Sequence, residues 1–227
     1  MRHLWLPILT LLSMIRTRIF HIRVREWFPE DDAIARIMAR LLVAREDLYL
    51  EMQGMSEDAL PPLDECSSEW RTIYFFRNSA PTLMEIRSAI EMLKQKKEFL
   101  KALSSQNTFN DAYQELVTDM DKASDIVRKL RNEVAGHLKD GAFEEGLGKI
   151  DSTIKSTVQA GDRPKDTHYR FALEFIGAVI LRHADADPKP EWNRILESTN
   201  QVSFRAVKAI DMLFMAYSEQ RGFLQSI

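Results

Sequence analysis

The most constraining feature of the sequence is a helical spacing of apolar residues that persists from Pro29 almost to the C-terminus. Apolar side chains recur three or four positions apart through each long segment, which places them on one face of an α-helix. No run between residues 30 and 227 alternates apolar and polar residues over the length of a strand. The pattern therefore predicts an all-α fold, an antiparallel bundle of about five long helices.

Prolines, glycines and polar stretches divide this pattern into five predicted helices. The first begins at residues 29–32, Pro-Glu-Asp-Asp, because proline suits the first turn and acidic residues suit the positive end of the helix dipole, and it runs to about Gly54. The second spans residues 69–103, with a kink expected at Pro81. The remaining three carry the apolar stripes from Phe109 to Val134, from Tyr169 to Ile180 and from Ile195 to Tyr217.

The chain divides into an N-terminal extension of uncertain structure, residues 1–29, and one helical domain, residues 30–227. Within the extension, the apolar run Leu4–Ile15 is shorter than the roughly 20 residues that span a bilayer. No small-residue cleavage site follows it. The extension can be an ordered or frayed segment, a membrane-surface or partner-binding arm, or a targeting signal. We expect a cytoplasmic protein without a transmembrane anchor.

Composition excludes several classes of protein. The net charge of -3 excludes a histone-like polycation, and the single Cys66 excludes an internal disulfide or a multi-cysteine metal site. Motifs for phosphate loops, zinc proteases, serine hydrolases and EF-hands are absent. The group His183, Asp185 and Asp187 precedes Pro188 and is interpreted as helix capping rather than a metal site. We therefore predict no metal and no cofactor.

The clearest chemical signal is the segment RNEVAGH at residues 131–137, at the end of the third predicted helix. The spacing of Arg131 and His137 resembles the signature of the HEPN superfamily, an arginine followed after four to six residues by a histidine. Similar spacings occur at Arg16/His21 and Arg163/His168. Only Arg131/His137 follows a long amphipathic helix and carries an asparagine, Asn132, directly after the arginine.

The resemblance implies a helical bundle that acts as a metal-independent endoribonuclease, in many members a toxin or phage-defence effector. It assigns catalysis to Arg131, Asn132 and His137, and support of the motif to a polar residue of the second helix, for which we choose Glu85. The HEPN toxins that are modified by a partner nucleotidyltransferase carry tyrosine two positions after the histidine, where this chain has Lys139. This departure argues against that mode of neutralisation and leaves another antitoxin or defence-system protein as the candidate partner.

The motif lies in a locally basic stretch. Residues 122–139 hold five Lys or Arg against two acidic residues, in a chain that is negative overall. We expect Arg128, Lys129 and Lys139 to contact RNA phosphates. The alternative is a solvated helix face on which Lys129 pairs with Glu133.

Helix geometry separates the two motif side chains. Six positions on one α-helix correspond to about 120° of rotation and about 9 Å of rise, so Arg131 and His137 do not converge within one helix. A composite site therefore needs either unwinding of the helix at Gly136 or a second copy of the chain. The resemblance implies the second, a symmetric homodimer, and we expect Leu130 and Val134 in or beside its interface. Two alternatives stay open: a structural capping histidine beside an ordinary surface arginine, and a non-catalytic module that binds nucleotides, RNA or a protein.

Overall fold

In the computed structural model, which describes residues 22–55, 65–104, 107–133, 140–153, 155–156, 158–159, 168–169, 171–182 and 188–223, the chain is all-α apart from one pair of two-residue strands. The elements in chain order are α2 Val24–Trp27, α3 Ala33–Met55, α4 Glu65–Lys94, α5 Lys97–Ser104, α6 Asn107–Glu133, α7 Asp140–Leu147, β1 Val158–Gln159, β2 His168–Tyr169, α8 Phe171–Leu181 and α9 Pro188–Gln220. The predicted all-α class is confirmed.

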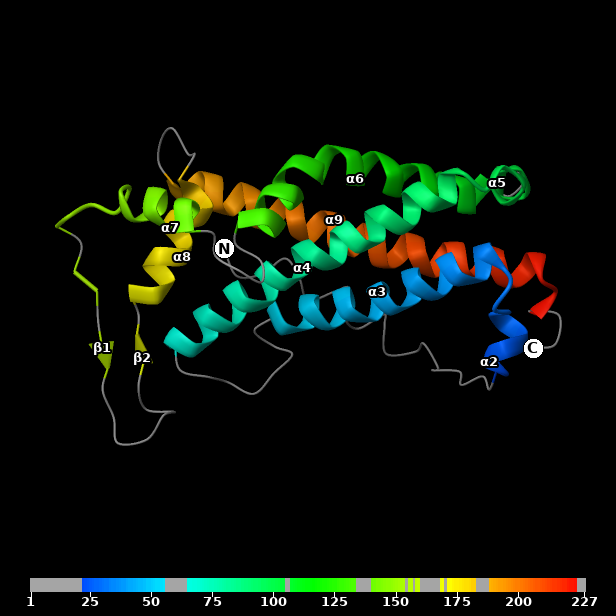
Figure 1. The fold of residues 1–227 in the computed structure, drawn as a ribbon, viewed down its shortest axis with the longest axis horizontal. Helices are drawn as coiled ribbons and strands as arrows, with labels where there is room; N and C mark the ends of the chain where they lie inside the picture. Colours follow the sequence, from blue (N-terminus) through cyan, green and yellow to red (C-terminus); the bar gives the residue numbers. More distant parts are fainter. Residues whose placement is uncertain are drawn as a thin grey trace, which may run out of the picture.

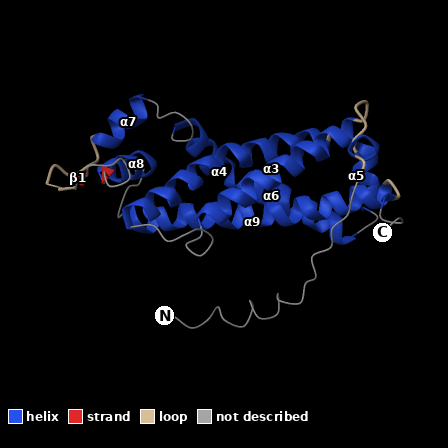
Figure 2. Cartoon of the chain, turned by 90° about the horizontal axis from the view of Figure 1, so that it is seen from below, coloured by secondary structure: helices blue, strands red, loops and turns tan. Residues whose placement is uncertain are grey.

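Four long helices, α3, α4, α6 and α9, lie side by side around one hydrophobic core (Figure 1). Consecutive long helices run in opposite directions along the molecule. The short α5 lies at one end of these helices, and α7, α8 and the two strands lie at the other (Figure 2). The core takes buried side chains from α3, α4, α5, α6 and α9, and its largest fully buried members include Phe76, Leu83, Ile86, Leu213 and Tyr217.

Arginine–carboxylate pairs connect neighbouring long helices and fix their register. In the four pairs given below, the closest arginine nitrogen and carboxylate oxygen lie 2.5 to 3.7 Å apart. Three of the pairs are exposed, and pairs of that kind typically add less than about 1 kcal/mol of stability. In the fourth, Arg205–Asp119, the aspartate is buried. All four show which residues face one another. The pairs are Arg40–Glu85 for α3 and α4, Arg45–Asp211 for α3 and α9, Arg87–Asp121 for α4 and α6, and Arg205–Asp119 for α9 and α6.

The first helix begins four residues later than predicted, and Asp32 precedes it as a cap rather than lying in its first turn. The Asp32 carboxylate accepts hydrogen bonds from the backbone N–H groups of Ile34 and Ala35, at 2.8 and 3.1 Å. These bonds satisfy amides that have no partner within the helix, which is the role of an N-cap residue. Helix α3 accordingly begins at Ala33.

The predicted second helix, 69–103, is wrong in its extent. Helix α4 begins at Glu65, continues through Pro81 and ends at Lys94, and a separate α5 follows. The break is a turn in which the N–H of Lys96 donates to the carbonyl of Leu93 at 2.9 Å. Between Leu93 and Phe99, both buried, the sequence holds only polar residues, so the apolar spacing lapses where the helix ends.

The C-terminal half also differs from the prediction. Tyr169 belongs to β2, and the fourth predicted helix is the short α8 of 11 residues. The chain thus has four long helices among its described residues rather than five. Helix α9 is longer than predicted because it begins at Pro188, where a missing N–H costs nothing in the first turn. The proposed capping group at His183, Asp185 and Asp187 lies outside the described residues.

Helices α7 and α8 form a small unit with its own apolar cluster. The cluster consists of Ala142, Ile176 and Val179, with Ile73 of α4 packed against it. Gly146 allows this contact, because a Cβ at that position would lie 2.8 Å from Val179 Cγ2 and 2.9 Å from its backbone nitrogen. In the same unit, the buried Arg182 side chain donates from Nε to the Glu145 carboxylate at 3.0 Å.

The described part of the N-terminal extension packs against the end of α9. The Trp27 ring stacks on Phe223 with ring centroids 4.4 Å apart, and the Tyr217 hydroxyl donates to the Trp27 carbonyl at 2.5 Å. Arg221 pairs with Asp32 at the start of α3. Residues 1–21, including the apolar run Leu4–Ile15, lie outside the described residues. Among those that are described, no helix has the length and hydropathy to cross a bilayer.

Candidate functional site

The last turns of α6 carry the described half of the Arg-to-His motif. Val127 and Leu130 are buried in the main core, 3% and 5% exposed, and they hold this end of the helix in place. Arg128, Arg131 and Asn132 lie on the other faces of the helix and are exposed. Arg131 is also the basic residue of the last turn, where the negative end of the helix dipole favours a cation.

The other half of the motif lies beyond the described residues. Helix α6 ends at Glu133 and α7 begins at Asp140, and His137 and Lys139 lie in the interval of residues 134–139. The side chain of Lys129 is likewise outside the described part, so its expected pairing with Glu133 stays a prediction.

Leu130 does not lie where the dimer prediction puts it. Its side chain belongs to the core of the single chain, packed among residues of the long helices. A side chain that is 5% exposed within one chain offers almost no surface to a second copy. The expectation that Leu130 packs in or beside a two-fold interface is therefore wrong, and Val134 lies outside the described residues.

Glu85, the predicted supporting residue, faces α3. Its Oε1 accepts hydrogen bonds from Arg40 Nε at 2.9 Å and from Arg40 Nη2 at 2.5 Å. With Asp47 and Pro81, this pair lines a shallow groove of about 490 Å³ between α3 and α4. Arg131 is not among the groove's lining residues, so the structure does not bring Glu85 together with the motif.

A different residue of α4, Arg77, lies near the level of the motif. The contact of Arg87 with Asp121 sets the register of α4 against the antiparallel α6. Ten residues back along α4 lead from Arg87 to Arg77, and ten residues forward along α6 lead from Asp121 to Arg131, about 15 Å in each case. On two straight antiparallel helices, these equal distances would place the two arginines at about the same height.

Arg77 differs from the exposed Arg131 in its surroundings. It is half-buried, and this desolvation lowers its pKa from the usual value. The sequence marks Arg77 as a polar residue of the second helix, but periodicity alone does not distinguish it from Glu85. The distinguishing signal is the helix register, which becomes readable only when the antiparallel partner is known.

A second ionisable group that the sequence does not reveal, Glu51, contacts Thr82, a residue that lines the α3–α4 groove. Glu51 accepts a hydrogen bond from the Thr82 hydroxyl at 2.8 Å, and its other oxygen is buried without a hydrogen-bond partner. Burial, with a smaller contribution from the neighbouring Asp47 carboxylate, raises the pKa of Glu51 to about 7. At neutral pH this carboxyl is therefore partly protonated.

Two further findings bear on the site. No group of three or more histidine, cysteine, aspartate or glutamate side chains in the described part of the chain is arranged to hold a metal ion. No family model, curated protein or solved structure matches the chain.

Proposed function

We propose that this protein is a metal-independent endoribonuclease of the HEPN type. The observation that carries the proposal is the placement of Arg131 and Asn132, exposed and adjacent on the last turn of α6 while Leu130 anchors that turn in the core. A rigid helix end that presents a guanidinium and an amide to solvent suits a phosphodiester substrate, because arginine forms paired hydrogen bonds to phosphate oxygens.

RNA supplies the nucleophile for this reaction. The 2′-oxygen attacks the adjacent phosphorus and forms a new P–O bond, the bond to the 5′-oxygen breaks, and the 2′ proton is removed while the leaving oxygen gains one. His137 suits one of these two proton transfers because the ordinary pKa of histidine lies near 6.5. Arg131 stabilises the charge on the phosphorus oxygens, and Asn132 orients the substrate or a neighbouring group. The products are a 2′,3′-cyclic phosphate and a 5′-hydroxyl.

The basic residues around the motif supply electrostatic affinity for the same substrate. Arg128 is exposed one helical turn before Arg131 and Asn132, and Lys129 and Lys139 flank the motif in the sequence. Each phosphate that such residues neutralise steepens the dependence of binding on salt. RNA affinity is therefore expected to fall strongly between low and physiological ionic strength.

A symmetric homodimer is part of this proposal. Its support is the resemblance, which implies that two motif segments meet across a two-fold axis, so that two copies supply their arginine and histidine side chains to one cleft. The interface has to be built from residues other than Leu130. A toxin or phage-defence role, with an antitoxin or defence-system partner, is the biological setting that the resemblance implies.

The decisive experiment compares His137→Ala and Arg131→Ala with a matched control. We expect either substitution to lower the rate of RNA cleavage at least 100-fold, a loss typical of removing an acid–base or charge-stabilising group. His168→Ala is the control, because His168 belongs to the other Arg-to-His spacing in the domain and lies on β2.

Product analysis by mass spectrometry and assays with and without EDTA complete the test. Activity that EDTA abolishes, or equal cleavage of DNA, contradicts the proposed chemistry. Full cleavage by His137→Ala contradicts the assigned site and favours a non-catalytic binding module. Sedimentation that shows a monomer at concentrations where RNA is still cleaved contradicts the dimer.

A further inference from the structure

Two exposed aromatic rings and an arginine share one face of the first turns of α4. Trp70 and Tyr74 are 38% and 53% exposed, although large aromatic side chains are normally among the most buried. At 100° per residue, Trp70, Tyr74 and Arg77 fall within about 60° of one another around the helix, so they form one stripe. We refer to these three residues as the α4 stripe.

The α4 stripe lies at the same end of the molecule as the motif. Helix α4 begins, and α6 ends, at the end that carries α7 and α8 (Figure 1). On straight helices, the register set by Arg87 and Asp121 places Arg77 at about the height of Arg131, and Tyr74 and Trp70 lie one and two turns further toward the start of α4. The two rings therefore lie toward the end of the molecule that carries α7 and α8.

The Tyr74 ring contacts the ring of Phe75, its neighbour in the helix. Its centroid lies 5.3 Å from that of Phe75, with the two rings nearly perpendicular. Such an edge-to-face contact restrains both rings, and 53% of Tyr74 stays exposed to solvent. Alternating aromatic and basic side chains are the usual means by which proteins bind single-stranded nucleic acids, through base stacking and phosphate contacts.

We propose that the α4 stripe is a binding track that selects single-stranded RNA and leads it to the motif, an inference that rests on the proposed function. Unpaired bases stack on Tyr74 and Trp70 while Arg77 and Arg131 contact successive phosphates of the same strand. A duplex fits this track poorly, since its bases already stack on one another and its A-form major groove is too narrow for side chains.

The test measures binding apart from cleavage. In the full chain carrying His137→Ala, fluorescence anisotropy reports the affinity for a labelled dodecamer of uridine and for a labelled RNA duplex of twelve base pairs. We expect the single strand to bind at least tenfold more tightly than the duplex. We expect Tyr74→Ala and Trp70→Ala each to weaken single-strand binding about tenfold, the loss typical of one stacking ring.

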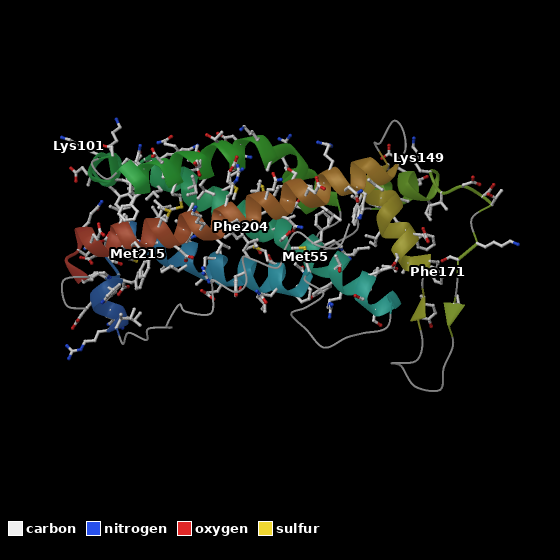
Figure 3. The ribbon with its side chains drawn as sticks, turned by 180° about the vertical axis from the view of Figure 1, so that it is seen from behind. Met55, Lys101, Lys149, Phe171, Phe204 and Met215 are labelled. Carbon is white, nitrogen blue, oxygen red and sulfur yellow. The ribbon has the colours of Figure 1, made fainter. Side chains whose placement is uncertain are left out.

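Phe204→Ala is the matched control. Phe204 is an aromatic residue of α9 that is 63% exposed, and it borders the groove between α6 and α9 with Ala112 and Glu115. Figure 3 shows it midway along α9, away from the end marked by Lys149 and Phe171. Its removal is expected to leave RNA affinity within twofold.

Two further variants separate loss of stacking from loss of folding if Tyr74→Ala unfolds. Tyr74→Phe keeps an aromatic ring and is expected to retain RNA binding, whereas Tyr74→Leu is expected to lose it.

Three results overturn the proposal, and each points elsewhere. Unchanged affinity in Tyr74→Ala and Trp70→Ala, together with a loss in Arg131→Ala, refutes the track and leaves the proposed function standing. A chain that neither binds nor cleaves RNA refutes both. A change of sedimentation coefficient in Tyr74→Ala without a change in RNA affinity assigns the stripe to a protein interface instead.

Discussion

The long-helix core and the α7–α8 unit bury apolar side chains on very different scales. The core joins five helices through one continuous cluster, whereas the cluster between α7 and α8 has three buried residues and borrows Ile73 from α4. Because hydrophobic stabilisation grows with buried area, the two regions should differ in resistance to local unfolding. The Arg-to-His motif lies between them in the sequence, since Arg131 belongs to the last turn of α6 and His137 precedes α7. The proposed site therefore combines one residue on a firmly packed helix with one on the connection to the weaker unit.

A pair of identical substitutions measures this difference directly. Ile86 is fully buried in the core and Ile176 is 3% exposed in the α7–α8 cluster. Ile86→Ala is expected to lower the free energy of unfolding by about 4 kcal/mol, because the packed surroundings cannot close the cavity. Ile176→Ala is expected to cost about 2 kcal/mol, because a three-residue cluster collapses more easily. Equal losses in urea denaturation would show that the two sites are packed equally well and would contradict the comparison.

The α7–α8 unit can also be loosened by adding a single methyl group. Gly146→Ala places a Cβ within 2.9 Å of the Val179 backbone, and we expect a cost of about 2 kcal/mol from the forced shift of one helix against the other. Hydrogen exchange should accelerate in α7 and α8 and stay unchanged in α3 and α9. Gly177→Ala is the control, since nothing lies within 4 Å of the added methyl, and it should leave α8 as stable or more stable. Faster exchange throughout the long helices would contradict the independence of the unit.

A pH titration tests a partly buried carboxyl group of the long helices, Glu51 of α3. The pKa of Glu51 is raised to about 7 in the folded protein, above its value of 4.5 in an unfolded chain, so the folded state binds the proton more tightly. The contribution of Glu51 to the free energy of unfolding has its full value below pH 4.5, and it disappears as the pH rises through 7. The loss should be about 1 kcal/mol, a figure reduced for solvent screening. Glu51→Gln should abolish this part of the pH dependence of Tm, whereas a pH profile identical to that of the wild type would refute the assigned cause.

The helices of the core were predictable because their apolar residues keep a strict spacing. The acidic residues 30–32 signal that a helix follows, but the predicted start lies four residues too early, because Asp32 caps α3 from outside and Pro29 does not belong to it. The end of α4 was missed because Leu93 and Leu100 were joined into one stripe, although Phe99 and Leu103 already define a new one. In the α7–α8 region the sequence has glycines and weak periodicity, so Tyr169 was placed in a helix rather than in β2.

The candidate site was predictable only within one helix. Exposure of Arg131 next to a buried Leu130 follows from their adjacent positions on an amphipathic helix. The pairing of Glu85 with Arg40 and the level shared by Arg77 and Arg131 depend on how α3, α4 and α6 are aligned. Such alignments are set by contacts between distant segments, which no local pattern of a single sequence encodes.

The contact between Trp27 and the end of α9 has a consequence for how the protein is made. The hydrogen bond from Tyr217 to the Trp27 carbonyl joins residues separated by 190 positions. During synthesis, Trp27 therefore cannot make this contact until α9 has been synthesised. Helices α3 and α4 follow each other directly in the sequence, so they can pair much earlier. A ribosome that pauses within α9 would hold a nascent chain with its first hairpin formed and its two ends still apart, a stage at which chaperones have the longest access to the unfinished core.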